Sequence, residues 1–272
     1  MLQFYHGNTS ILRLVAGGLG DTIQLQFDSY ETDIRGQWPN LKREWTIDEA
    51  DELAWQLREI VPWLVSRTKS VYYKNKKEGF WENQLCHLYG RYWTPDKEWL
   101  VLDRQAVIGF PSSTARTEFF EPIISKRNAA MWSVFSSQAR KWAHPRTIGT
   151  ELDLLLLNRK RELVCMELKH ASSSAGVYYG PFQAAVYREA FCSAADSIVD
   201  NIETMAKQKL ALLLLPAAAS SMFPITQPAV VHGVLAVVGT PSIEVQGRLE
   251  VCLKCCAEIE HRSISEEPFL TE

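Results

Sequence analysis

The stretch from Glu151 to Lys169, ELDLLLLNRKRELVCMELK in one-letter code, contains two apolar runs separated by a charged link. Each run (151–157 and 163–169) is too short for an ordinary helix, and apolar runs flanking a polar turn are typical of a hairpin. We therefore predict two adjacent strands. An apolar strand normally excludes charge, because burying an unpaired carboxylate is costly. Asp153, Glu167 and Lys169 therefore need an explanation.

A divalent metal ion would explain these charges. Residues i and i+2 of a strand point to the same side, so Glu167 and Lys169 share a face. Two carboxylates on adjacent strands, with a lysine beside them, can hold a hard cation such as Mg²⁺ and leave room for a phosphate and a water. Asp153 reaches the same face only if the numbers of cross-strand partners sum to an even number, for example if Asp153 lies opposite Glu167 with the turn centred on Lys160. The hypothesis thus requires an odd-length turn or a bulge rather than a two-residue turn.

An aspartate, a hairpin and then Glu-x-Lys resemble the core motif of the PD-(D/E)XK nuclease superfamily, with Leu152 where that motif often has proline. Downstream, Gln183 and Tyr187 are spaced to lie on one face of a helix. This spacing resembles the additional Gln-x-x-x-Tyr motif of the exonuclease branch of the superfamily. The resemblance covers about residues 115–240.

The resemblance implies an α/β (α+β) protein with a restriction-endonuclease-like core, in which a central mixed sheet is flanked by helices. It implies a nuclease dependent on Mg²⁺, with Mn²⁺ as a substitute, that hydrolyses phosphodiester bonds, with DNA as the expected substrate. The metal ligands would be Asp153, Glu167, the carbonyl of Leu168 and one upstream glutamate, for which Glu121 is the candidate, with Glu118 and Glu82 as alternatives.

The same resemblance assigns roles to the other site residues. Lys169 would orient or help to deprotonate the attacking water, or stabilise charge growing on phosphorus. Gln183 and Tyr187 would position the substrate strand or brace the metal ligands. The catalytic candidates are therefore Asp153, Glu167, Lys169, Gln183 and Tyr187.

Composition sets broad limits on the protein. Its 272 residues can form one large domain or two small ones, and 46% hydrophobic and 22% charged residues are typical of a soluble globular protein. A net charge of −3 gives no general basic excess, so nucleic-acid binding would need a local basic patch. Six cysteines without a signal peptide indicate reduced thiols in a cytoplasmic protein, and the longest apolar run, 210–219, is too short to span a membrane.

We expect two domains. An N-terminal β-rich α+β domain over residues 1–111 would select the substrate or a partner, and a nuclease-like domain would cover 112–272. In the first, we expect strands near 11–15 and 22–27 and a hairpin within 98–110 that turns at 103–105. Thr46 and Glu49 predict a capping box that opens an amphipathic helix ending at Pro62.

The second domain should begin with a helix over 118–142. A polar, small-residue loop is expected at 171–176, followed by one long or two shorter helices over 182–209. Strands are expected at 230–238 and 248–256. Cys252 and Cys255 form a CxxC without a second pair, so zinc is not favoured.

Three interpretations remain open from the sequence. The first is an active nuclease, the second is a nuclease-fold protein that binds nucleic acid or assembles with partners without cutting, and the third is an unrelated α+β protein in which the motif is accidental. The basic window 67–77, interrupted by Tyr72 and Tyr73, is either a nucleic-acid contact or a solvated loop. A homodimer is reasonable, because double-strand cleavage calls for two active sites.

Overall fold

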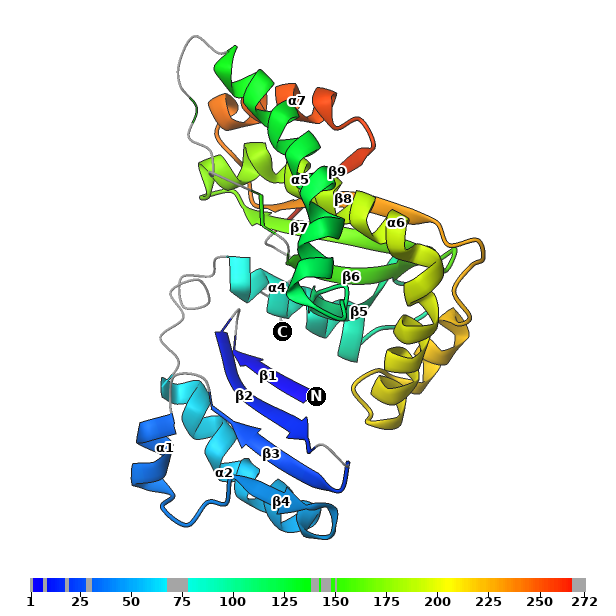
Figure 1. Cartoon of the computed structure of the whole chain (residues 1–272). Helices are drawn as coiled ribbons and strands as arrows, with labels where there is room; N and C mark the ends of the chain where they lie inside the picture. Colours follow the sequence, from blue (N-terminus) through cyan, green and yellow to red (C-terminus); the bar gives the residue numbers. More distant parts are fainter. Residues whose placement is uncertain are drawn as a thin grey trace. The chain divides into compact units, whose positions relative to one another are not determined.

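The computed structural model describes residues 2–6, 9–17, 20–27, 31–67, 78–137, 142, 148–149 and 151–265 (Figure 1). The chain forms two compact units, Met1–Phe80 and Trp81–Glu272, and each unit has its own sheet. The boundary therefore lies earlier than the expected one at residue 111. The reason is that β5 (Trp99–Ala106) pairs with β6 (Leu152–Asn158), which draws the segment after residue 80 into the second unit.

The first unit is built on a four-stranded antiparallel sheet with the order β1-β2-β3-β4. Its elements are β1 (Leu2–His6), β2 (Thr9–Ala16), β3 (Thr22–Gln26), α1 (Glu31–Gln37), β4 (Glu44–Thr46), η1 (Ile47–Glu49) and α2 (Ala50–Arg67). The core joins Ile11, Leu12 and Leu25 of the sheet to the buried face of α2. Of the basic window 67–77, only Arg67 lies within the described residues.

The start of the α2 region follows the sequence prediction, whereas its end does not. The capping box predicted between Thr46 and Glu49 is confirmed, and in it the Thr46 amide donates to Glu49 Oε2 at 3.1 Å. The helix continues through Pro62 to Arg67, so the predicted end at Pro62 is wrong. Proline removes one helical hydrogen bond, and the burial of Ile60 and Leu64 on either side of it outweighs that loss.

The second unit contains a five-stranded sheet with the order β5-β6-β7-β8-β9, and the expectation of a mixed sheet is confirmed. Strands β5, β6 and β7 (Leu163–His170) are antiparallel neighbours, and β7, β8 (Val231–Val238) and β9 (Ile259–Ile264) run parallel. The hairpin expected within 98–110 is absent, because β5 is one strand with a register shift between Val101 and Asp103. The charged residues of β5 form ion pairs with other elements: Asp103 pairs with Lys209 (2.7 Å), and Arg104 pairs with Glu82 (3.0 Å).

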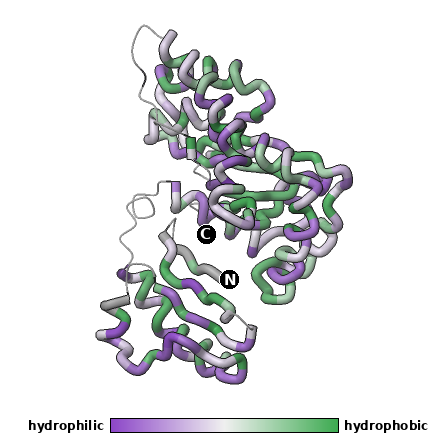
Figure 2. Tube along the Cα trace, viewed as in Figure 1, coloured by the Kyte–Doolittle hydropathy of each residue, from purple (hydrophilic) through white to green (hydrophobic). Residues whose placement is uncertain are grey.

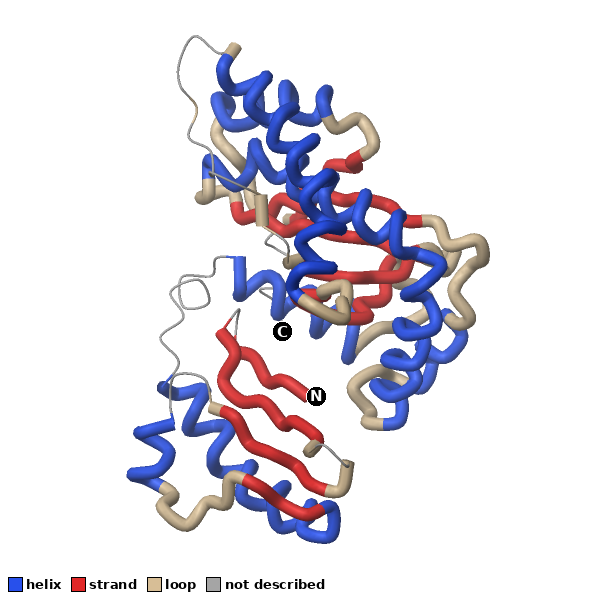
Figure 3. The backbone as a smooth tube through the Cα atoms, in the orientation of Figure 1, coloured by secondary structure: helices blue, strands red, loops and turns tan. Residues whose placement is uncertain are grey.

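Helices cover this sheet (Figures 1 and 3). Helix α6 (Ser174–Ala211) lies on β7 and β8, and α5 (Ser113–Ser136) and α7 (Ile243–Cys255) pack against α6. The remaining helical segments are α4 (Glu78–Cys86), η2 (His87–Arg91) and η3 (Ala217–Met222). In the part of the chain that is described, no helix combines the length and the apolar character needed to cross a membrane.

Two predictions about these helices are corrected. Helix α6 is continuous and begins at Ser174, within the segment expected to be a loop. The strand expected at 248–256 is the second half of α7. Its buried residues Val245, Leu249 and Cys252 recur at helical spacing, and Ser242 Oγ caps the helix by accepting from the Val245 amide at 3.4 Å.

The central strands of the second unit are buried on both sides. Figure 2 shows the strongly apolar trace of this sheet. Leu155 and Leu157 of β6, with Leu163 and Cys165 of β7, form one core with Phe182 and other α6 side chains. Because side chains alternate along a strand, Asp153, Glu167 and Lys169 belong to this same α6-facing side. The charged residues therefore lie where α6 meets the sheet.

Candidate active site

The hairpin between β6 and β7 has the register that the metal hypothesis required. Leu154 pairs with Met166 and Leu157 with Leu163, and one further step places Asp153 opposite Glu167. The turn is centred on Lys160 and closes with Asn158 N donating to Glu162 O at 3.0 Å. An odd-length turn is therefore confirmed, and both carboxylates fall on one face.

Side chains hold this turn in place. Asn158 Oδ1 accepts from the amides of Lys160 (2.9 Å) and Glu162 (3.0 Å), and Asn158 Nδ2 donates to Glu162 Oε2 at 2.7 Å. The same Glu162 oxygen lies 2.8 Å from His232 Nε2 on β8. The hydrogen bonds from Asn158 and from His232 lower the pKa of Glu162. Arg161 completes the turn with φ at 62°.

Asp153, Glu167 and Lys169 converge. Lys169 Nζ lies 2.5 Å from Glu167 Oε1 and 3.8 Å from Asp153 Oδ2. Glu167 is 1% exposed and Lys169 is 7% exposed, whereas the Asp153 side chain is 25% exposed. The triad is thus a buried ion pair with one carboxylate at its solvent-facing edge.

Few charged side chains are buried in the part of the chain that the structure describes. Among the described residues, the buried charged side chains are Glu82, Glu167 and Lys169. Glu82 has a structural partner in Arg104, whose Nη2 lies 3.0 Å from Glu82 Oε1. A buried ion pair is often no more stabilising than apolar residues of similar volume. The pair on β7 therefore favours a functional reason for its presence.

The oxygen atoms at this edge suit a hard cation. The Leu168 amide donates to Asp153 Oδ2 at 2.8 Å. In a strand the N–H and C=O of one residue point to the same edge, so the Leu168 carbonyl also faces the Asp153 side. Two carboxylates and a carbonyl are the ligand types that Mg²⁺ and Mn²⁺ prefer. The residues present therefore fit a divalent ion.

Tyr187 belongs to the same electrostatic environment. It is 2% exposed on α6, and its hydroxyl interacts with the backbone of Glu151. Burial, followed by the charges of Glu167 and Asp153, raises the pKa of Tyr187. The hydroxyl therefore stays protonated and can donate a hydrogen bond.

Gln183 lies one helical turn before Tyr187. Its Oε1 atom is buried and has no hydrogen-bond partner among the described residues. An unsatisfied buried acceptor is unusual, so a water or a substrate donor would be stabilised there. Both members of the expected Gln-x-x-x-Tyr pair are thus on α6, the helix that covers the triad.

The predicted fourth metal ligand is not brought to the site. Glu121 is exposed on α5, because the neighbouring Phe120 and Ile123 turn into the core. Glu118 is also exposed, and Glu82 is engaged by Arg104. Within the described residues, no three side chains of metal-ligating type come together. The assignment of Glu121 as a ligand is therefore wrong for this arrangement.

Gly176 contributes to the site and was not predicted. A Cβ at Gly176 would lie 2.5 Å from Ser173 Oγ and 3.2 Å from Lys169 Cδ, so the first turn of α6 approaches the Lys169 side chain closely. The available signal was the small-residue run at 171–176. The N-terminus of a helix carries unpaired N–H groups and partial positive charge, which favour an anion near Lys169.

Comparison with known proteins identifies no relative: no family model, no curated protein and no solved structure matches this chain. The site is therefore interpreted from its own residues.

All six cysteines lie in described segments and none forms a disulfide. Burial raises the pKa of Cys252 and that of Cys256 to about 12, so both remain thiols at neutral pH.

Proposed function

We propose that this protein is a metal-dependent nuclease that hydrolyses phosphodiester bonds in DNA, with a site of the PD-(D/E)XK type. The observation that carries the proposal is the convergence of Asp153, Glu167 and Lys169 on one side of the β6–β7 hairpin. The mixed sheet flanked by helices supports it, and so does the position of Gln183 and Tyr187 on α6.

Charge balance supports a divalent ion at this site. The two carboxylates and the ammonium carry a net charge of −1, which leaves the site short of positive charge. One dication and one phosphodiester would bring the total to zero, and a neutral total is favourable where water is largely excluded. Asp153, Glu167 and the Leu168 carbonyl would hold the ion. When bound, it supplies Lewis-acid polarisation of the phosphate and lowers the pKa of a coordinated water.

The protein's own groups then have defined tasks. Lys169 lies beside both carboxylates and offsets one of their two negative charges while no cation is present. When a cation takes over that task, the ammonium can donate to a phosphate oxygen or to the attacking water. Tyr187 donates a hydrogen bond, because its pKa is raised and its proton is retained. Gln183 offers a buried acceptor to the substrate or to an ordered water.

Two observations favour a second function, namely DNA binding without cleavage. Glu167 is almost fully buried and held by Lys169, and the upstream glutamate expected as a further ligand is not at the site. A protein that retained this ion pair in the presence of Mg²⁺ would bind nucleic acid through the same fold and not cut it. Cleavage assays separate the two functions.

The test compares wild type with Asp153→Asn, Lys169→Met and the control Lys160→Met on labelled single-stranded DNA, duplex DNA and RNA. Each substrate is incubated with Mg²⁺, with Mn²⁺ and with EDTA. We expect cleavage of DNA by wild type and by Lys160→Met with either metal, and no cleavage by the other two variants. Binding without cleavage in every metal would support the second function. Equal cleavage by Asp153→Asn would exclude this site as the catalytic one.

A further inference from the structure

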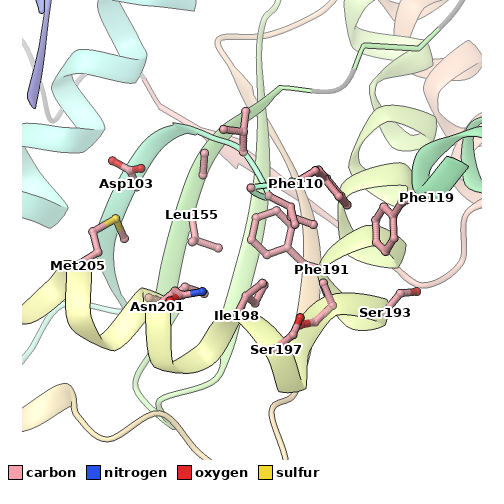
Figure 4. A pocket seen from close by; sticks show the side chains of 16 residues that line it. Asp103, Phe110, Phe119, Leu155, Phe191, Ser193, Ser197, Ile198, Asn201 and Met205 are labelled. Atoms are coloured by element: carbon pink, nitrogen blue, oxygen red, sulfur yellow. The ribbon is translucent and has the colours of Figure 1, made fainter. Parts of the chain in front are cut away.

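A cavity of about 520 Å³ lies between the end of β5 and α6 (Figure 4). Leu155 and Phe191 point into it from the sheet and the helix, and Phe110 and Phe119 form an aromatic wall with ring centroids 5.1 Å apart. Its volume falls in the range of small-molecule sites, about 300–1,000 Å³. No function described above uses this cavity.

The cavity is adjacent to the catalytic triad along two elements. Leu155 follows Asp153 by two residues on β6 and shares its face, which corresponds to a separation of roughly 7 Å along the strand. Phe191 follows Tyr187 by one turn of α6. In addition, Ala106 lines the cavity and pairs with Leu152, the residue before Asp153. A group attached to a phosphate at Asp153 can therefore reach the cavity.

The lining selects a neutral group rather than an anion. Among the described residues that line the cavity there is no lysine, arginine or histidine. Its polar groups are Asp103, Ser193, Ser197 and Asn201. Lys209 bonds to Asp103 Oδ1 at 2.7 Å, which balances the carboxylate charge and leaves Oδ2 to accept from a ligand. The site thus offers aromatic surface on one side and hydrogen-bond acceptors and donors on the other.

We propose that this cavity binds a nucleobase turned out of the strand whose phosphate lies at Asp153. This inference rests on the proposed function and adds a subsite to it. Flipped or unpaired bases are held between apolar and aromatic side chains and are read by hydrogen bonds to their edges. Asparagine pairs with the edge of adenine and aspartate accepts from the amino group of cytosine, so Asn201 and Asp103 are suited to this task.

The subsite has a consequence for the substrate. A base can enter the cavity only when it is unpaired, so single strands, frayed ends and flipped nucleotides are preferred over an intact duplex. Each base stacked on an aromatic residue changes affinity by roughly 5–150-fold. The same stacking tolerates many sequences, because every base has a π-face.

The experiment uses a fluorescein-labelled DNA hexanucleotide and a counterpart with the same backbone but no bases, and measures binding by anisotropy with Ca²⁺ present. We expect wild type to bind the base-free probe roughly tenfold more weakly. Ser197→Trp fills the cavity from an exposed position on α6, and we expect it to bind both probes equally. Gln208→Ala, an exposed change on the same helix outside the lining, should keep the wild-type ratio.

A second variant covers the case in which Ser197→Trp does not fold. Asn201→Leu keeps the side-chain size and removes the amide, so it should weaken binding of the hexanucleotide at least threefold and leave the base-free probe unchanged. If the folded variants keep the wild-type ratio of affinities for the hexanucleotide and the base-free probe, the base subsite is overturned, even if the protein cuts DNA. If these variants lose the preference for the base-containing probe and the wild type cleaves no DNA with any metal, the subsite is supported and the proposed nuclease activity is refuted. No binding of either probe by wild type would overturn both.

Discussion

Replacing Lys169 by methionine tests the triad most directly, because it removes the ammonium 2.5 Å from a carboxylate that is 1% exposed. Removing one partner of a buried ion pair typically costs about 3–5 kcal/mol, since the remaining charge stays buried. For a unit of this size, each kcal/mol corresponds to about 2–4 °C in Tm. We therefore expect Lys169→Met to lower the Tm by about 6–20 °C in EDTA.

Divalent ions should reverse part of this loss. In Lys169→Met the Glu167 carboxylate has lost its cationic partner, and Mg²⁺ or Mn²⁺ can replace that positive charge. A ligand that binds only the folded state raises the stability of the protein. The assay is thermal unfolding followed by circular dichroism, in EDTA and across a Mn²⁺ titration. The double variant Lys169→Met/Glu167→Gln should recover most of the lost stability, because it removes both charges.

Lys160→Met is the matched control, since Lys160 is exposed in the turn of the same hairpin. A surface change of this kind should stay within about 0.5 kcal/mol of wild type. Wild-type stability of Lys169→Met in EDTA would refute the reasoning. If the double variant Lys169→Met/Glu167→Gln shows the same fall in Tm as Lys169→Met, the destabilisation comes from lost packing of the lysine side chain and not from its charge.

Three further predictions concern Asp153, Gly233 and Glu162 of the second unit. Asp153→Asn keeps an oxygen that can accept from the Leu168 amide, so unfolding free energy should fall by less than about 1 kcal/mol, while calorimetric Mn²⁺ affinity should fall roughly tenfold or more. Gly233→Ala should lose about 1–3 kcal/mol in urea denaturation, because its Cβ would lie 2.4 Å from the Cδ1 atom of buried Ile259. The hydrogen bonds from Asn158 and His232 lower the pKa of Glu162, so they stabilise the fold above the unfolded pKa of about 4.3, and this contribution is lost as pH falls through the folded pKa. Glu162→Gln should therefore differ from wild type most at neutral pH, by no more than about 1 kcal/mol for this solvent-accessible group, and the difference should vanish in strong acid when measured by urea denaturation across pH.

Each of these predictions has a clear contrary result. Unchanged Mn²⁺ binding by Asp153→Asn would place any metal elsewhere. A Gly233→Ala protein as stable as wild type would mean that the end of the Ile259 side chain moves aside without loss. A Glu162→Gln deficit that grows toward acid would have the opposite sign from a lowered pKa and would show that another group controls the acid transition.

The hairpin and its three charged residues could be predicted from the sequence. Two apolar runs around a polar link specify adjacent strands, and the alternation of side chains places Glu167 and Lys169 on one face. An odd turn then places Asp153 beside them, which the register of β6 against β7 shows. These features depend on neighbours in sequence, and local geometry is sufficient to determine them.

The tertiary structure decided the features that depend on distant partners. The run at 248–256 alternates like a strand, but its apolar side chains are buried as a helix against α6. The segment Trp99–Ala106 forms one strand because β6 offers a continuous partner edge, and this pairing places the domain boundary before the segment. The core contacts of Phe120 turned Glu121 to solvent, and the meeting of β5 with α6 created the cavity. Local sequence determines which faces of a segment are apolar. Burial and hydrogen bonding between distant parts of the chain determine which elements those faces pack against, and so whether the segment becomes a helix or a strand.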